Sequence, residues 1–267
     1  MFELVAHGPD TYVGSGPQYP WGGLYGGQIV AQALRAATLS VEPAFAPHSI
    51  RAYFIRRGDH TEPVRYEVDR IRNGRSFVTR RVVARQAVGA ILNAECSFQR
   101  PEESPVVQTV TMPDVPAPDE FPDVSFSAHF ERRQLPAGAV AGPRDGAGRH
   151  AAWFRATADL ADAPPVLHDC WLAYISDDMP TDAVFNALCP SRPNESGWEG
   201  VMSVSLDHTV WFHRPLRADR WHLYDMTCHF VGGSRGLAFG HVFTADGEHV
   251  ASLAQEVLVR VPPAGDS

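Results

Sequence analysis

One segment, residues 25–37, limits the folds open to this chain more than any other. Gln28, Gln32 and Arg35 follow the spacing i, i+4, i+7, so in a helix they form one narrow polar stripe. Apart from Tyr25, every other residue of the segment is Ala, Ile, Val, Leu or Gly. A helix that is apolar around most of its circumference must be buried on most sides. We therefore expect a central helix with a β-sheet wrapped around it.

The predicted helix begins with two glycines, Gly26 and Gly27. Free backbone N–H groups and the helix dipole favour negative charge at a helix N-terminus. A substrate carbonyl that becomes an oxyanion would be stabilised there by the N–H of Gly27 or Gln28. The alternative is a core helix with a Gly-rich entry turn that has no chemical role.

The residues after this helix carry the alternation of apolar and polar side chains that is typical of half-buried strands. The predicted strands cover residues 48–55, 64–69, 76–85 and 90–99. The pair Asn73–Gly74 indicates a tight hairpin between the second and the third of these strands. The first hundred residues are thus predicted to form one helix followed by an antiparallel meander.

The second half of the chain repeats this pattern. Apolar residues with helical spacing run from Leu167 to Ile175, and a strand pattern covers residues 201–213. The segment that begins at Tyr53 aligns without gaps with the segment that begins at Trp211. The last predicted strand, residues 250–260, corresponds to residues 90–100 in the same way. Two copies of one helix-plus-meander unit explain this periodicity.

Between the two units the composition changes. Residues 101–123 are rich in proline, which predicts an extended linker, and residues 136–149 are rich in Pro, Gly and Ala, which predicts a second loop. We therefore divide the chain into an N-terminal unit, a linker and loop, and a C-terminal unit. These parts cover residues 1–100, 101–150 and 151–267.

Composition excludes several classes of function. The chain has 267 residues and no lysine, which excludes lysine Schiff bases and Walker-type phosphate sites. A formal charge of −8 argues against nucleic acid as a partner. No run of 18 apolar residues and no secretory signal are present, so we expect no membrane segment. The four cysteines contain no CxxC pair, which favours reduced thiols and a cytoplasmic location.

Two further features of the sequence invite a catalytic interpretation. Residues 232–236 satisfy the GxSxG pattern around Ser234, and Asp246 and His249 follow it. A nucleophile elbow needs a helix after the serine, whereas residues 237–243 have a strand pattern. The twelve histidines include no HExxH and no Cys/His ladder, so we predict no metal site. We interpret four of them as strand residues: His213, His222, His229 and His241.

Several blocks of the chain together resemble the bacterial acyl-CoA thioesterase II family. In the first half they are residues 25–34 (YGGQIVAQAL), 48–49 (HS), 53–59 (YFIRRGD), 73–77 (NGRSF) and 80–82 (RRV). In the second half they are residues 174–177 (YISD), 207–215 (DHTVWFHRP), 246–247 (DG), 250–252 (VAS) and 255–256 (QE). The resemblance implies an α+β double hotdog, in which two helix-wrapped antiparallel sheets arise from an internal repeat.

In that family an Asp, a Thr or Ser, and a Gln hold the hydrolytic water. By motif, the resemblance places these roles on Asp177, Ser205 and Gln255. Gln255 lies on the apolar face of its predicted strand, where an unpaired amide would be costly. The helical pattern places Asp178 rather than Asp177 nearest the apolar stripe, so either carboxylate remains possible.

The expectation for Ser205 is the least direct. An uninterrupted strand over residues 201–213 puts Ser203, Ser205 and Asp207 on one polar face, which lines either solvent or the cleft between the units. Asp207 and His208 are neighbours on a strand, so they should point to opposite faces and not pair.

The resemblance implies an acyl-CoA thioester hydrolase with acyl-CoA as substrate and no metal or organic cofactor. We also expect a homo-oligomer with no nucleic-acid or membrane partner. Two rival functions remain: a hotdog enoyl-CoA hydratase, whose Asp/His dyad we do not find, and a non-catalytic acyl-CoA binder. An α/β-hydrolase esterase that uses Ser234 is the weakest alternative.

Overall fold

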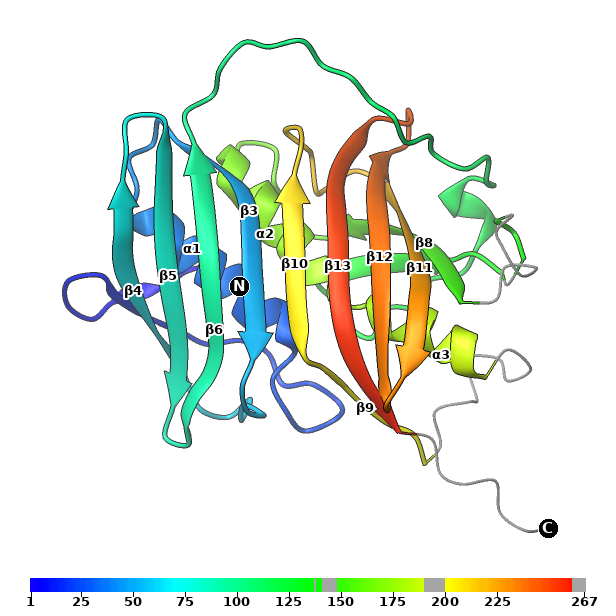
Figure 1. The fold of residues 1–267 in the computed structure, drawn as a ribbon, viewed down its shortest axis with the longest axis horizontal. Coiled ribbons are helices and arrows are strands. Elements are labelled where there is room, and N and C mark those ends of the chain that lie inside the picture. The colour runs from blue at the N-terminus through cyan, green and yellow to red at the C-terminus, as the bar shows by residue number, and fades with distance from the viewer. Residues whose placement is uncertain (137, 141–147, 190–199, 261–267) are drawn as a thin grey trace.

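The computed structural model describes residues 1–136, 138–140, 148–189 and 200–260, which form a 13-stranded antiparallel sheet curved around helices (Figure 1). The strands of the N-terminal half are β1 (Val5–Ala6), β2 (Thr11–Gly14), β3 (Ala46–Phe54), β4 (Val64–Asn73), β5 (Phe77–Gln86) and β6 (Gly89–Gln99). Those of the C-terminal half are β7 (Phe130–Gln134), β8 (Arg149–Ala156), β9 (Met202–Ser205), β10 (Asp207–Phe212), β11 (His222–Gly232), β12 (Arg235–Thr244) and β13 (His249–Arg260). The helices are α1 (Gly26–Leu39), α2 (Pro165–Ile175), α3 (Pro180–Leu188) and the 3₁₀ turn η1 (Pro118–Glu120).

The order of the strands shows the internal repeat. The sheet runs β1-β2-β4-β5-β6-β3-β10-β13-β12-β11-β8-β7, and β9 pairs with β13 beside this path. Strands β2-β4-β5-β6-β3 of the first half are therefore mirrored by β8-β11-β12-β13-β10 of the second. Helices α1 and α2 lie against each other on one side of the sheet (Figure 1). The predicted double hotdog, with two α+β units joined through one sheet, is confirmed.

The central strand pair, β3 and β10, confirms the predicted alignment of the two halves. In its antiparallel register Tyr53 is opposite Asp207, and Ser49 is opposite Trp211. A twofold axis that relates Tyr53 to Trp211 must also relate Ser49 to Asp207, because the aligned segments contain no gap. These two pairings are then copies of each other, so the register of the central strands is itself symmetric.

The segment between the two units contains one strand that the sequence pattern did not predict. Strand β7 lies within the predicted linker and loop of residues 101–150 and pairs with β8 at the sheet edge. Its sequence, FERRQ, lacks apolar alternation because its inward side chain at Arg132 belongs to an ion-pair cluster. The part of the linker near residue 116 docks on β8, where Trp153 Nε1 donates to the Pro116 carbonyl (3.0 Å). The predicted second loop lies largely outside the described residues.

The polar stripe of α1 faces the N-terminal segment and strand β4 of the sheet. Gln32 is fully buried, and its amide nitrogen donates to the carbonyls of Met1 (2.9 Å) and Ser15 (2.8 Å). Its amide oxygen accepts from the Tyr66 hydroxyl (2.7 Å). The side-chain oxygen of Gln28 accepts from the Tyr19 hydroxyl (2.7 Å). The stripe therefore holds residues 1–19 against the helix through amide hydrogen bonds.

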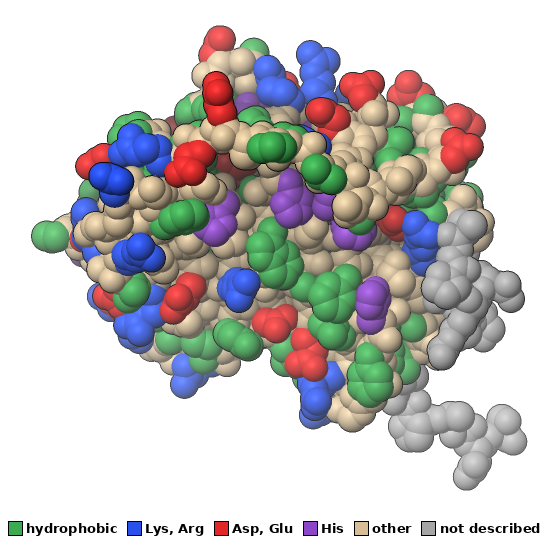
Figure 2. Space-filling model, turned by 45° about the horizontal axis from the view of Figure 1, so that its top comes forward, with side chains coloured by type: hydrophobic (Ala, Val, Ile, Leu, Met, Phe, Trp, Pro, Cys, Tyr) green, Lys and Arg blue, Asp and Glu red, His purple; other side chains and the backbone are tan. Residues whose placement is uncertain are grey.

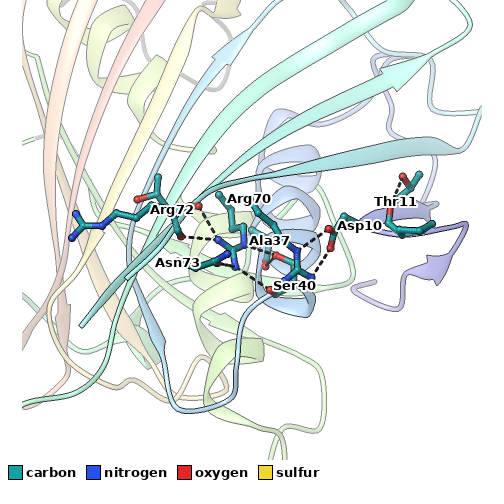
Figure 3. A network of polar contacts seen from close by, with 10 residues as sticks. Asp10, Thr11, Ala37, Ser40, Arg70, Arg72 and Asn73 are labelled. Atoms are coloured by element: carbon teal, nitrogen blue, oxygen red, sulfur yellow. Dashed lines mark hydrogen bonds and ion pairs between the residues drawn. The ribbon is translucent and has the colours of Figure 1, made fainter. Parts of the chain in front are cut away.

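The C-terminal end of α1 is closed by a buried arginine without a carboxylate partner among the described residues. Arg80 is 2% exposed and donates to Ser40 Oγ (2.8 Å), to Asn73 Oδ1 (2.7 Å) and to the Arg72 carbonyl (2.9 Å). Figure 3 shows these acceptors together, beside the ion pair between Arg70 and Asp10. The cation lies at the negative end of the helix dipole, which stabilises it there.

Candidate active site

The two helices meet at a point where only glycine fits. Helix α2 ends at Ile175, and Asp177 follows in the turn beyond it, against the N-terminus of α1. A Cβ atom at Gly26 would lie 2.4 Å from Asp177 Oδ2, and one at Gly27 would lie 2.1 Å from the Tyr174 carbonyl oxygen. The glycines therefore let the carboxylate of Asp177 approach the end of α1, where the Gly27 N–H donates to it.

Asp177, Ser205 and Gln255 lie together at the junction of the two halves. Gln255 Nε2 donates to Ser205 Oγ (2.8 Å), and Ser205 Oγ donates to Asp177 Oδ1 (3.1 Å). The inward face of β13 is as predicted, because Leu253, Gln255 and Val257 are all buried. Asp177 and Ser205 are 28 positions apart in the sequence, and Ser205 and Gln255 are 50 apart, yet the three form one continuous hydrogen-bond chain.

The predicted strand over residues 201–213 is broken, and the prediction for its faces is wrong. Strand β9 ends at Ser205, and β10 begins at Asp207. Between them, the Leu206 N–H donates to the Glu256 carbonyl, and the Leu206 carbonyl accepts from the Phe54 N–H. The break shifts the alternation by one residue. Ser205 therefore points inward like His208, on the side of the buried core, whereas Val204 is 46% exposed.

Burial dominates the electrostatics of the carboxylate. It raises the pKa of Asp177 to about 7, and the neighbouring carboxylate of Asp178 acts in the same direction. The hydrogen bonds from Ser205, Gln255 and the Gly27 N–H oppose this rise, because they stabilise the charged form. A carboxyl group with a pKa near neutrality can accept a proton at neutral pH and release it again.

Asp178, the other candidate, belongs to a different cluster. Its Oδ2 accepts from Arg132 Nη1 (2.9 Å), while Arg132 Nη2 donates to Asp182 Oδ2 (2.6 Å). Burial raises the pKa of Asp178 to about 6, although the Arg132 charge opposes this. The turn after α2 therefore sends one carboxylate to Ser205 and Gln255 and the next to a buried ion-pair cluster.

Comparison with known proteins identifies the family. The model of the acyl-CoA thioesterase N-terminal domain matches residues 16–99, and that of the acyl-CoA thioesterase C-terminal domain matches residues 106–259. The chain belongs to the acyl-CoA thioesterase family. It is 36% identical to acyl-coenzyme A thioesterase 8 of Rattus norvegicus, over 90% of this chain and 81% of that protein.

A bacterial relative and a solved structure agree. Acyl-CoA thioesterase 2 of Haemophilus influenzae is 33% identical over 89% of this thioesterase and 87% of its own length. The crystal structure of acyl-CoA thioesterase II TesB2 from Mycobacterium marinum superposes with a TM-score of 0.84 at 35% identity. That alignment covers 100% of this chain and 98% of the other, so both hotdog units are shared.

The two backbone groups expected to form an oxyanion site are both engaged in this thioesterase. The Gly27 N–H donates to the Asp177 carboxylate, and the Gln28 N–H donates to the Tyr25 carbonyl (3.1 Å). A substrate carbonyl would have to replace one of these partners, and the oxyanion role of Gly27 or Gln28 stays a prediction. Two buried side-chain groups near the terminus, Gln28 Nε2 and the Tyr25 hydroxyl, have no hydrogen-bond partner among the described residues.

Ser234 occupies a hairpin turn of the thioesterase and not a nucleophile elbow. Gly233 and Ser234 have φ values of 58° and 60° and connect β11 directly to β12. Two consecutive positive φ values define a type I′ turn, which matches the twist of the paired strands.

No cluster of three metal-binding side chains occurs in the described part, and no described helix is long and apolar enough to cross a bilayer.

We expect Ser234 to be dispensable for catalysis. Because the turn requires only a positive φ, Ser234→Ala should retain the wild-type rate of CoA release, and a serine-directed fluorophosphonate should not inhibit the enzyme. The measurement is thioester hydrolysis with and without the reagent, with mass spectrometry of the peptide that carries Ser234. Stoichiometric labelling of that peptide, with loss of activity, would contradict the assignment.

Proposed function

We propose that this acyl-CoA thioesterase cleaves its substrate by direct attack of water, with Asp177 as general base. The observation that carries the proposal is the contact chain in which Ser205 Oγ lies between Gln255 Nε2 (2.8 Å) and Asp177 Oδ1 (3.1 Å). A water molecule that enters this group meets one proton acceptor and two groups that orient it, which raises the rate by alignment.

The proposed reaction has a simple proton balance. Asp177 takes a proton from water as the water oxygen forms its bond to the thioester carbon. The C–S bond then breaks, and the CoA sulfur receives the proton from Asp177, which leaves a carboxylic acid and free CoA thiol. A thioester carbonyl placed beside Asp177 would compete for the Gly27 N–H, and the helix dipole would stabilise the developing oxyanion there.

Release of free CoA thiol from a panel of acyl-CoAs of different chain length tests the activity. A non-catalytic binder would bind acyl-CoA without turnover, and an enoyl-CoA hydratase would consume the enoyl double bond without releasing thiol. Single-turnover hydrolysis in ¹⁸O-labelled water, followed by mass spectrometry of the protein, tests direct attack. A covalent acyl-enzyme adduct would overturn that mechanism.

The pH dependence follows from the raised pKa of Asp177. Only the ionised carboxylate can accept a proton, so kcat/KM should rise with pH and level off above about 7. Asp178→Asn removes a neighbouring negative charge, so the same rise should move to lower pH in that variant. Thioester absorbance, which needs no thiol reagent, measures both profiles. A flat wild-type profile through neutrality would contradict the base assignment.

Substitutions at Ser205 test the hydroxyl itself. Ser205→Thr retains a hydroxyl and should keep activity close to that of the wild type, with a more restrained χ1 angle. Ser205→Ala removes the bridge between Gln255 and Asp177 and should lower kcat by roughly 10-fold, as expected for one hydrogen bond. Steady-state kinetics on both variants measure this difference. An Ala variant as fast as the Thr variant would remove Ser205 from the mechanism.

The cellular setting is also proposed. The four cysteines, Cys96, Cys170, Cys189 and Cys228, are free thiols, which fits the reducing cytoplasm.

We further propose that the enzyme forms a homo-oligomer. Figure 2 shows hydrophobic side chains interspersed with charged ones on the surface, and among the exposed hydrophobic residues are Tyr53 and Phe230, at 65% and 66% exposure. Sedimentation velocity measures the assembly state, and a monomer at micromolar concentration would contradict this proposal.

A further inference from the structure

We propose that His208 is a positioning residue that holds the Gln255 amide in the one orientation useful to the active site. The inference rests on the proposed roles of Asp177, Ser205 and Gln255, and it concerns a residue that need not touch the substrate. His208 lies on β10, next to the break that turns Ser205 inward. In the sequence His208 stands out only as a member of the block of residues 207–215, with the expectation that it points away from Asp207.

Both ring nitrogens of His208 have partners, and the ring is fully buried. Nδ1 lies 2.5 Å from Gln255 Oε1, and Nε2 lies 2.7 Å from Ser176 Oγ. Ser176 is the residue between the end of α2 and Asp177. The imidazole therefore connects the residue before the proposed base with the residue that holds Ser205, and it closes a ring of side chains around the site.

The direction of each hydrogen bond in this ring follows from Asp177. An ionised carboxylate only accepts hydrogen bonds, so the Ser205 hydroxyl must donate its single proton to the bond with Asp177. Ser205 Oγ then accepts from Gln255, which requires the Gln255 Nε2 group on that side. The amide oxygen of Gln255 is left facing His208, and because that oxygen only accepts, His208 Nδ1 must carry the proton.

The other side of the ring completes the assignment. A neutral imidazole with its proton on Nδ1 has a bare Nε2, which accepts from the Ser176 hydroxyl. That hydroxyl also lies 3.2 Å from the Ala173 carbonyl, which is a longer contact than the one to the histidine. Burial lowers the pKa of His208 to about 4, so the ring stays neutral across the working range.

The alternative arrangement shows what His208 prevents. If the ring carried its proton on Nε2, the bare Nδ1 would attract the Gln255 N–H₂ group, and the amide would rotate by 180°. Gln255 would then present its oxygen to Ser205, and Ser205 would donate to Gln255 instead of Asp177. The base would lose a hydrogen bond, and no amide N–H would remain to orient water.

A matched pair of substitutions separates positioning from packing. The side-chain amide of Asn places a donor near the position of the histidine Nδ1. Leu has almost the same shape as Asn but no donor. We expect His208→Leu to lower kcat by roughly 10-fold with little change in KM, as for the loss of one well-placed hydrogen bond. His208→Asn should recover most of the lost rate. A role in packing alone predicts the reverse order, because a buried amide is harder to satisfy than Leu.

The tautomer provides a test on the wild-type enzyme, in which a variant serves only to assign the signal. Long-range ¹H–¹⁵N NMR spectra of the wild-type enzyme labelled with ¹⁵N-histidine distinguish protonated Nδ1 from protonated Nε2, and the His208→Asn spectrum identifies the signal. Protonated Nδ1 supports the proposal, and protonated Nε2 overturns it. Equal rates for the Leu and Asn variants would also overturn it.

One more variant separates this inference from the proposed site. If Gln255→Ala is impaired in kcat while His208→Leu is not, His208 has no positioning role but the site stands. If Gln255→Ala retains the wild-type rate, the site itself is wrong and the inference falls with it. A thermal melt and binding of a non-hydrolysable CoA thioether confirm that each variant is folded.

Discussion

Replacement of Asp177 by Asn should lower kcat by roughly 10²–10⁴-fold, the usual contribution of a general base, while acyl-CoA still binds. Asn keeps the shape of the side chain and its contact with Ser205, but it cannot accept a proton from water. The effect should therefore appear in kcat and in kcat/KM alike, with KM almost unchanged. Steady-state release of CoA thiol gives both constants, and binding of a CoA thioether confirms the intact site.

The neighbouring carboxylate is the matched control for this prediction. Asp178→Asn removes an equal charge one residue away, but Asp178 contacts Arg132 and not the proposed water-binding residues. Its kcat at pH 8 should stay within about 10-fold of the wild type, since only longer-range electrostatics change. An inactive Asp178→Asn enzyme beside an active Asp177→Asn enzyme would reverse the assignment. Full activity in both would remove the general-base mechanism.

The sequence could not decide between these two carboxylates for a physical reason. The apolar stripe of α2 extends to Ile175, where the helix ends, so helical periodicity no longer describes where the next side chains point. In the turn that follows, one carboxylate points to α1 and the other to β7. Only the family resemblance favoured Asp177, and the contacts with Ser205 and Gln255 agree with that choice.

The fold was predictable because its signals are local or repeated. The polar stripe of α1, the alternation in β4 and the inward face of β13 all follow from side-chain periods within one element. The alignment of Tyr53 with Trp211 then fixed the symmetry of the central strand pair. Each of these features needs only residues that are close in the sequence or repeated in it.

The features that were missed depend on partners far away in the sequence. The break at Leu206 exists because its backbone bonds to Phe54 and Glu256, neither of which is marked by a local pattern. Strand β7 is polar because Arg132 finds its carboxylates on the α2–α3 segment. His208 is ordinary as a strand residue, and its role emerges only with its two buried partners in place.

Arg132→Met should lower the free energy of unfolding by roughly 3–5 kcal/mol, the cost of removing one partner from a buried ion pair. The Arg132 side chain is 11% exposed, and its guanidinium bonds to Asp178 at 2.9 Å and to Asp182 at 2.6 Å. Met fills a similar volume but leaves both carboxylates without their cation. The matched control is Arg235→Met, whose exposed pair with Glu256 should contribute no more than about 1 kcal/mol.

The loss in the free energy of unfolding should depend on pH, and the direction of this dependence follows from Asp178. A carboxyl group whose pKa is raised in the folded state opposes folding above that pKa, and the opposition disappears as the group is protonated. The pKa of Asp178 is already raised to about 6 with Arg132 present, and removal of the cation raises it further. The deficit of Arg132→Met should therefore be largest near pH 8 and smaller near pH 5.

His150 should act in the same direction. Burial, together with the Arg132 charge and against the opposing Asp182 carboxylate, lowers its pKa to about 4, so loss of Arg132 lets the imidazole take a proton more readily as the pH falls. The resulting cation lies 3.4 Å from Asp182 and would replace part of the lost attraction. Urea unfolding of the wild type, Arg132→Met and Arg235→Met at both pH values measures the deficit. A deficit that stays constant or grows toward acid pH would show that lost packing, rather than the uncompensated carboxylates, controls the stability of this cluster.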